Sequence, residues 1–163
     1  MRRLLILATA IAVIAACAPG STTPPDQPHA FGETARSLLA ALNHERTSGA
    51  TCASDHYPPT RTLALERRLV AAAEVHTADM VRNGFFSHTG SDGSSVGQRV
   101  TREGYAWRAV GENIAWGQRS VEQVVAAWME SPGHCRAIMD AQFTELGAAR
   151  AENHWTLVFA TPR

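Results

Sequence analysis

The sequence predicts an α+β fold in which helices pack over a small, mostly antiparallel sheet. Two observations lead to this class. Apolar residues recur at helical spacing in two long segments of the chain's first half. Near its end, two apolar segments over residues 146–150 and 155–160 flank a turn at residues 151–153, as in a hairpin. Helices with one apolar stripe and paired strands bury their apolar faces by stacking in layers.

The first helix is expected over residues 33–47, before the stop signal at Gly49. Its apolar side chains follow the spacing of one helix face: Ala35, Leu38, Leu39 and Leu42. A second helix is expected over residues 65–82, ahead of Asn83-Gly84. Its inner stripe consists of Leu69, Ala72, Ala73, His76 and Met80. We therefore interpret His76 as a core histidine and not as a ligand.

Between and after these helices, shorter elements are expected. Residues 51–60 form a loop that holds Cys52, and residues 94–103 form a short helix. A strand is expected over residues 110–116, where apolar residues follow a turn.

A further helix begins at Ser120, because Ser120 and Gln123 have the spacing of a capping box. Its apolar face consists of Val121, Val124, Val125 and Trp128. Pro132-Gly133 is expected to end it, and one helical turn follows near residues 135–139.

The N-terminal residues carry signals for export. Arg2-Arg3 precedes an apolar run over residues 4–16 that is too short to span a bilayer. Residues 14–17, Ile-Ala-Ala-Cys, resemble the lipobox of bacterial lipoproteins, with cleavage before Cys17. The alternative is ordinary secretion with a cut after Ala18. That cut would place Pro19 beside the scissile bond, where its ring is unfavourable, so we favour the lipoprotein.

The chain accordingly divides into three parts: a lipoprotein-type signal peptide (1–16), a flexible Pro/Ser/Thr-rich tether (17–31) and a folded domain (32–163). Acyl chains such as palmitate on Cys17 would make the membrane a partner, since two or more chains give stable anchoring. We expect an exported, lipid-anchored protein of the cell envelope, with secretion as the alternative.

Length and net charge limit the number of domains and the classes of partner that the chain could have. The 163 residues fit one folded domain. The formal net charge is zero, with 15 basic residues, all of them arginine, and 15 acidic ones. A balanced charge provides no electrostatic basis for binding nucleic acid, so no such partner is expected.

The cysteines agree with export. With Cys17 assigned to lipid, Cys52 and Cys135 remain as an even pair in an oxidising compartment. We predict a disulfide between them, with two free thiols as the alternative. Because it would close a long loop, the chain-entropy model gives it about 4 kcal/mol.

Three separate segments combine an ionisable side chain with aromatic residues, glycine or proline: residues 85–90, 111–115 and 128–134. Ionisable groups are rarely buried unless they are paired or used. Three such segments at boundaries between loops and regular elements indicate one pocket built from distant parts of the chain.

These segments, in this order, resemble the CAP superfamily (cysteine-rich secretory proteins, antigen 5 and pathogenesis-related proteins), in particular its compact bacterial SCP-type domains. The resemblance covers residues 35–161 and implies a three-layer α-β-α sandwich. It also implies a cleft with two histidines and two acidic residues. His88, Glu112 and His134 match the cleft positions. Glu130 is the fourth candidate, although it follows Trp128 one residue earlier than the carboxylate of larger relatives does.

The chemistry of this set leaves alternatives open. Glu112 either orients an imidazole or acts as a base, or it ties down the loop. His88 and His134 are predicted ligands of a divalent metal such as zinc, because neutral imidazole binds it. We expect a binding module for a metal or for a small lipid-like or glycan ligand. The alternatives are a metal-assisted hydrolase of peptides or envelope polymers, and a structural envelope protein, and whether the protein is an enzyme is left open.

Overall fold

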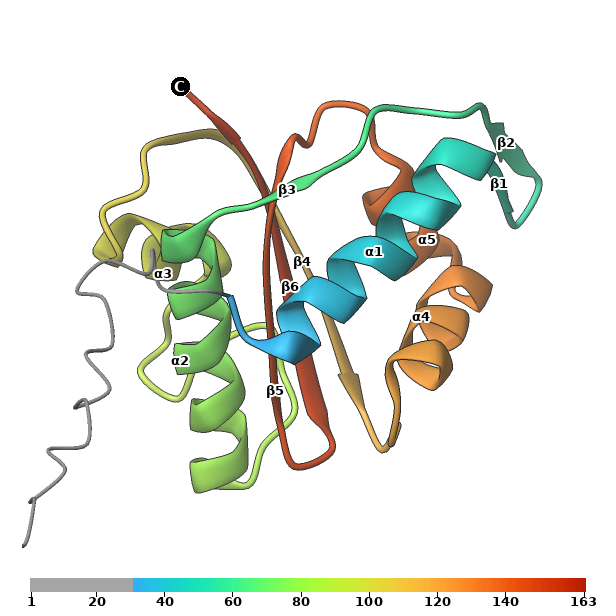
Figure 1. Cartoon of the computed structure of the whole chain (residues 1–163). Coiled ribbons are helices and arrows are strands. Elements are labelled where there is room, and N and C mark those ends of the chain that lie inside the picture. Colours follow the sequence, from blue (N-terminus) through green and yellow to red (C-terminus); the bar gives the residue numbers. More distant parts are fainter. Residues whose placement is uncertain (1–30) are drawn as a thin grey trace, which may run out of the picture. The chain divides into compact units, whose positions relative to one another are not determined.

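The computed structural model describes residues 31–163. Its middle layer is a four-stranded sheet in the order β3-β5-β6-β4, in which β3 pairs parallel with β5 and the other pairs are antiparallel. In Figure 1, α2 and α3 cover one face of the sheet, and α1, α4 and α5 cover the other. The α+β class and the three-layer sandwich are thereby confirmed. The strands are β3 (Ala64–Leu65), β4 (Trp107–Trp116), β5 (Glu145–Ala151) and β6 (His154–Pro162).

The helices agree with the prediction except at some of their boundaries. They are α1 (Glu33–Ser48), α2 (Arg67–Asn83), α3 (Val96–Arg102), α4 (Val121–Glu130) and α5 (Pro132–Met139). Helix α2 begins later than predicted because the Glu66 side chain accepts hydrogen bonds from the main-chain N–H groups of Arg68 and Leu69. Leu65, predicted as helical, instead pairs with Leu146 in the sheet.

Three further local predictions need correction. Pro132 begins α5 as well as ending α4, because a first helical residue needs no N–H partner. Ser120 caps α4 through the N–H of Gln123, but the Gln123 side chain accepts from the N–H of Arg119, so the box is incomplete. The predicted loop over residues 51–60 contains a small hairpin of β1 (Ala50–Cys52) and β2 (Asp55–Tyr57).

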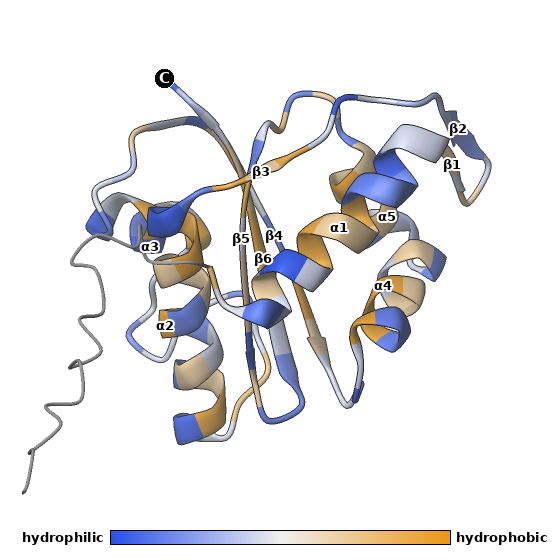
Figure 2. Cartoon of the chain, in the orientation of Figure 1, coloured by the Kyte–Doolittle hydropathy of each residue, from blue (hydrophilic) through white to orange (hydrophobic). Residues whose placement is uncertain are grey.

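Strand β6 divides the core between the two faces of the sheet. Because alternate side chains of a strand point to opposite faces, Leu157 and Phe159 pack with α1, α4 and α5, whereas Val158 packs with α2 and α3. Figure 2 shows the apolar sides of α1 and α4 turned toward the sheet. Gly147 allows α2 to approach β5 closely, since a Cβ there would lie 2.0 Å from the Leu69 carbonyl carbon.

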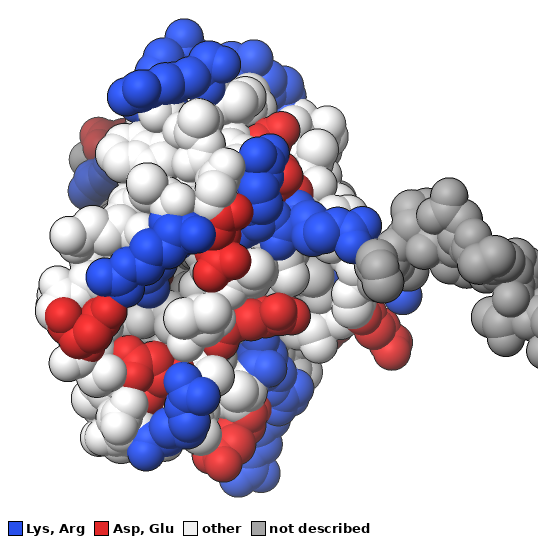
Figure 3. All heavy atoms as spheres, turned by 90° about the vertical axis from the view of Figure 1, so that its left-hand side faces the viewer, with Lys and Arg blue, Asp and Glu red and all other residues white. Residues whose placement is uncertain are grey.

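The surface over α2 and α3 carries both signs of charge. Figure 3 shows arginine and acidic side chains interspersed across this face. Within residues 31–163, no helix is both long enough and apolar enough to cross a membrane. The predicted signal peptide, the lipidation of Cys17 and nearly all of the tether lie outside the described residues.

Candidate functional site

A cavity of about 960 Å³ lies beside the outer edge of β4 and brings together His88, Glu112 and His134. His88 comes from the segment after α2, Glu112 from β4 and His134 from the first turn of α5. The other walls are residues 57–60, the main chain around Gly111 and residues 139–143, which include the Phe143 ring. Side chains far apart in the sequence therefore share one solvent-connected space.

Glu112 is the buried centre of this arrangement, with a side chain only 2% exposed. Its Oε2 accepts a hydrogen bond from Nη2 of Arg99 at 2.6 Å, and its Oε1 lies 2.8 Å from Nδ1 of His88. The adjacent guanidinium compensates the charge of the carboxylate, which would otherwise be costly to bury. Both carboxylate oxygens are thus engaged by protein groups.

The contact with Glu112 fixes how His88 presents its ring. A carboxylate can only accept, so Nδ1 of His88 is the donor, and Nε2 is the nitrogen left for a ligand. The His88 side chain is 58% exposed, so its free nitrogen is within reach of solvent.

Arg99 binds the main chain around His88 from the interior of the domain. Its guanidinium is almost completely buried and donates to the main-chain oxygens of Ser94 and His88. One buried arginine therefore fixes both the Glu112 carboxylate and the backbone of His88. Sequence analysis did not identify Arg99; a signal was available, since it occupies the buried side of a short, capped helix.

His76 lies fully buried beneath this site, as predicted for a core histidine. Its Nε2 is 2.9 Å from the main-chain oxygen of Ser87, which can only accept, so Nε2 carries the proton. Nδ1 is buried without a partner among the described residues. Burial lowers the pKa of His76, although the nearby Glu112 charge opposes this effect.

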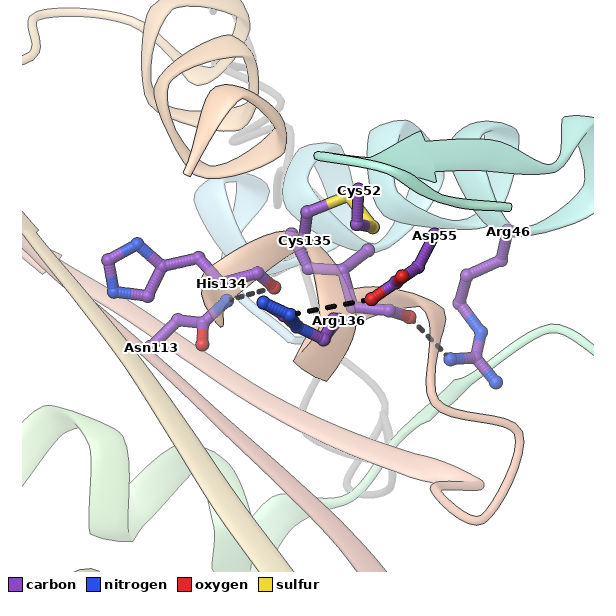
Figure 4. The surroundings of a disulfide bond; sticks show 8 residues. Arg46, Cys52, Asp55, Asn113, His134, Cys135 and Arg136 are labelled. Carbon is purple, nitrogen blue, oxygen red and sulfur yellow. Dashed lines mark hydrogen bonds and ion pairs between the residues drawn. A yellow bond between two sulfur atoms is a disulfide. The ribbon is translucent and has the colours of Figure 1, made fainter. Parts of the chain in front are cut away.

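His134 is positioned by its neighbours in α5 and β4. The Asn113 side chain donates to its main-chain oxygen at 3.1 Å. Figure 4 shows the imidazole pointing away from the neighbouring disulfide. Burial, followed by the nearby His88, lowers the pKa of His134. Its ring is therefore neutral at pH 7, the form that can bind a metal.

The predicted disulfide between Cys52 and Cys135 is present, with a Cα–Cα distance of 5.6 Å. It joins β1 to α5 directly after His134 (Figure 4).

The cavity wall beyond the disulfide depends on a second arginine that sequence analysis missed. Arg46 is fully buried on the apolar stripe of α1, and burial lowers its pKa. Its guanidinium donates to four main-chain oxygens, those of Arg61, Ile138, Asp140 and Phe143.

The structure does not bring Glu130 to this cavity. Glu130 is an exposed residue at the C-terminal end of α4 and does not line the space that contains His88 and His134. Its role in ligand binding stays a prediction. Across residues 31–163, no group of three or more His, Cys, Asp or Glu side chains is arranged to hold a metal ion.

The sandwich and its His/Glu cavity define an SCP-type domain. The family model for the cysteine-rich secretory protein family (CAP) matches residues 39–159, so the chain belongs to this family.

Relatives and solved structures agree with this assignment. YkwD of Bacillus subtilis (strain 168) is 33% identical over 101 residues, which cover 61% of this chain and 39% of YkwD. An extracellular SCP-domain protein from Bacillus anthracis str. Ames superimposes with a TM-score of 0.70 at 24% identity, covering 78% of this chain and 40% of that one. An outer surface protein from Borrelia burgdorferi gives a TM-score of 0.68 at 19% identity, with coverages of 78% and 92%.

The solved structures and the B. subtilis relatives support different conclusions. At 24% and 19% identity, the two solved structures show only that the fold is shared. The chain also spans 39% of YkwD and 24% of a second B. subtilis relative, the membrane protein YlbC, to which it is 30% identical over 84 residues, or 52% of this chain.

Proposed function

We propose that this protein is an exported, lipid-anchored CAP domain that acts as a ligand- or metal-binding module of the cell envelope. The observation that carries this proposal is the convergence of His88 and His134 on one cavity, with the buried Glu112 fixing the first of these rings. Such orientation of an imidazole by a carboxylate is typical of metal-binding histidines.

The cavity offers a divalent ion such as zinc two nitrogen ligands, one from each of the two imidazoles. His88 offers Nε2, and His134 offers a neutral ring because its pKa is lowered. Glu112 is not available as a third ligand while Arg99 and His88 occupy its oxygens. An ion held here would take its remaining ligands from water or from a bound molecule, which it would polarise.

The walls of the cavity suit a small amphipathic ligand, lipid-like or glycan. Pro58, Pro59, Met139 and Phe143 supply apolar surface opposite the two imidazoles. A volume of about 960 Å³ falls at the upper end of ordinary small-molecule sites, which run from roughly 300 to 1,000 Å³.

The alternative function is a metal-assisted hydrolase of peptides or envelope polymers. One observation favours it: two imidazoles reach the cavity while the other positions of an ion would stay open to water. We place it second because the proposed base, Glu112, is 2% exposed and paired with Arg99. A general base must reach the proton that it removes.

Export is supported by the disulfide, since such bonds persist mainly in oxidising compartments. Anchoring through Cys17 rests on the sequence pattern at residues 14–17. Secretion without a lipid is the alternative location.

Calorimetric titration of the purified protein with zinc tests the metal. We expect binding that weakens at least about tenfold in His88→Ala and in His134→Ala, since each removes one of two nitrogen ligands. His44→Ala, which changes an exposed histidine on α1 away from the cavity, is the matched control. If the wild type binds no zinc, the metal is excluded. NMR shifts of both imidazoles on adding a fatty acid or a cell-wall glycan fragment then test the ligand.

A further inference from the structure

Phe86, Trp116 and His154 form a second feature, which we call the aromatic patch. Phe86 is 49% exposed and Trp116 is 64% exposed. The His154 ring lies between them, with its centroid 6.5 Å from that of Phe86 and 6.0 Å from that of Trp116. With Phe85, the three rings line a shallow hollow of about 270 Å³. Within residues 31–163, Val75 is the only other large apolar side chain of comparable exposure.

The patch is assembled from three elements at one end of the sheet. Phe86 follows α2, Trp116 ends β4, and His154 begins β6, where it pairs with Trp116. This end carries the β5–β6 hairpin (Figure 1). Exposed aromatic residues that gather from separate elements mark a contact surface more often than scattered ones do.

The described chain begins beside β5 and the middle of α2, since Gly32 shares a hollow with Val70 and Glu74. Gly32 and Thr34 line a hollow together with residues 149–151 at the end of β5. Ala151 pairs with His154 of the patch across the hairpin. Thirteen residues separate Cys17 from Phe31 in the sequence, so a lipid on Cys17 would keep the domain near the bilayer.

We propose that the aromatic patch rests on the surface of the lipid bilayer to which the chain is anchored. This inference depends on the proposed anchor at Cys17, which would hold the domain within reach of the membrane. Tryptophan prefers the membrane–water interface, because its ring is apolar and its N–H remains polar. The other three tryptophans of the chain donate their indole N–H to protein oxygens, whereas that of Trp116 has no partner among the described residues.

Arg119 is the positive charge near the patch that suits an anionic lipid surface. Arg119 follows Trp116 by three residues, whereas Arg150, one register position from the Ala151–His154 pair, points to the opposite face of the strand, where its guanidinium lies 4.5 Å from the centre of the Trp155 ring. Both arginines are exposed, and neither takes part in an ion pair within the described part of the chain. Glu152 at the tip of the hairpin is the nearby carboxylate. Its main-chain oxygen accepts a hydrogen bond from Arg150.

Docking through the patch would orient the His/Glu cavity. Residues 139–143 of the cavity wall precede β5, whereas the hairpin of the patch follows β5. The two features therefore lie toward opposite ends of that strand. A domain resting on the patch would hold the cavity wall of residues 139–143 farther from the bilayer than His88, which follows Phe86 by two residues.

The test uses the full lipidated chain in vesicles of phosphatidylethanolamine and phosphatidylglycerol, part of whose lipids carry brominated acyl chains. Flotation of the vesicles reports the anchor. Bromine quenching of tryptophan fluorescence reports contact of the patch, because Trp128 and Trp155 are buried and the half-buried Trp107 lies at the opposite end of β4 from Trp116. We expect quenching that disappears in Trp116→Phe and falls at least twofold in Phe86→Ser. Val75→Ser, an equally exposed site outside the patch, should leave it unchanged.

A second arm separates the patch from the anchor. The unlipidated Cys17→Ser chain should partition weakly into the same vesicles, and Phe86→Ser with Trp116→Ser should reduce this partition at least about tenfold. Chains that float with the vesicles but show no quenching of Trp116 would overturn the patch proposal and leave the anchor standing. Chains that do not float refute the anchor, and the Cys17→Ser partition then decides the patch alone. Binding of the patch to cell-wall glycan in preference to vesicles would also overturn the proposal.

Discussion

At the scale of single residues, the site depends on how a buried carboxylate is compensated. Glu112 would be an unfavourable residue inside a strand without Arg99, which is itself 4% exposed. Each of the two charges is therefore stable in the interior only in the presence of the other, and His88 takes its orientation from this pair.

Glu112→Gln should therefore destabilise the domain by about 3–5 kcal/mol, because it leaves the buried Arg99 charge without its carboxylate. Urea denaturation measures this loss. Glu130→Gln, an exposed glutamate, is the matched control and should change stability by less than about 0.5 kcal/mol. A double change of Arg99→Gln with Glu112→Gln should cost less than the sum of the two single changes. Additive losses would show that the pair is not coupled.

His76 should make the stability of the domain depend on pH. Burial lowers its pKa in the folded state, so below the ordinary value of about 6.5 the unfolded chain binds a proton that the folded chain resists. Stability should fall as the pH drops from about 6.5 toward the lowered pKa, with no contribution from this group above that window. His76→Gln, which can still donate to Ser87, should flatten the slope in denaturation series across this range. His134→Gln should remove a separate part of the pH dependence of stability, in the same direction, because the pKa of His134 is also lowered. If neither variant changes the slope of stability against pH, this account is contradicted.

At the scale of elements, α5 is held to the rest of the domain at both ends. The disulfide fixes its first turn beside His134, and Arg46 binds the main-chain oxygens at its last turn. Because α5 supplies one wall of the cavity, these two contacts link the stability of the element to the shape of the site.

Cys52→Ser with Cys135→Ser should lower the free energy of unfolding by about 2–5 kcal/mol, since the bond closes a long loop. It should also broaden the NMR signals of the His134 ring, while those of His44 on α1 stay sharp. Thermal unfolding with and without reductant measures the loss in the free energy of unfolding. A wild type that reductant does not destabilise would refute the structural role of the bond.

At the scale of the whole molecule, the proposed N-terminal signals would decide where the domain works. Its fold is shared with the solved SCP-domain structure from B. anthracis and with the Borrelia surface protein. The disulfide and the lipobox-like residues 14–17 agree on an exported protein.

Cys17→Ser should release the protein from membranes or leave it unprocessed, with the domain still folded, because residues 31–163 have their own core. Mass spectrometry of the native N-terminus should find acyl chains on Cys17. An unmodified chain that begins at another residue would exclude the anchor and favour ordinary secretion.

Features with local causes could be predicted from the sequence. The apolar spacing of α1 and α2 and the hairpin of β5 and β6 each follow from a pattern within one segment. The pairing of Cys52 with Cys135 and the grouping of His88, Glu112 and His134 were also predictable, because unusual residues in distant segments pointed to one place.

The side chains that complete the His/Glu cavity could not be predicted in this way, because they come together only when the elements pack. Arg46 binds an oxygen 97 positions away, and Arg99 reaches Glu112 from another element. Glu130, the last residue of α4, is exposed and does not line the cavity. Phe86 and Trp116 both lie against the His154 ring only because α2 and β4 finish at the same end of the sheet. Contacts of this kind depend on how elements pack, and no periodic pattern in one segment encodes them.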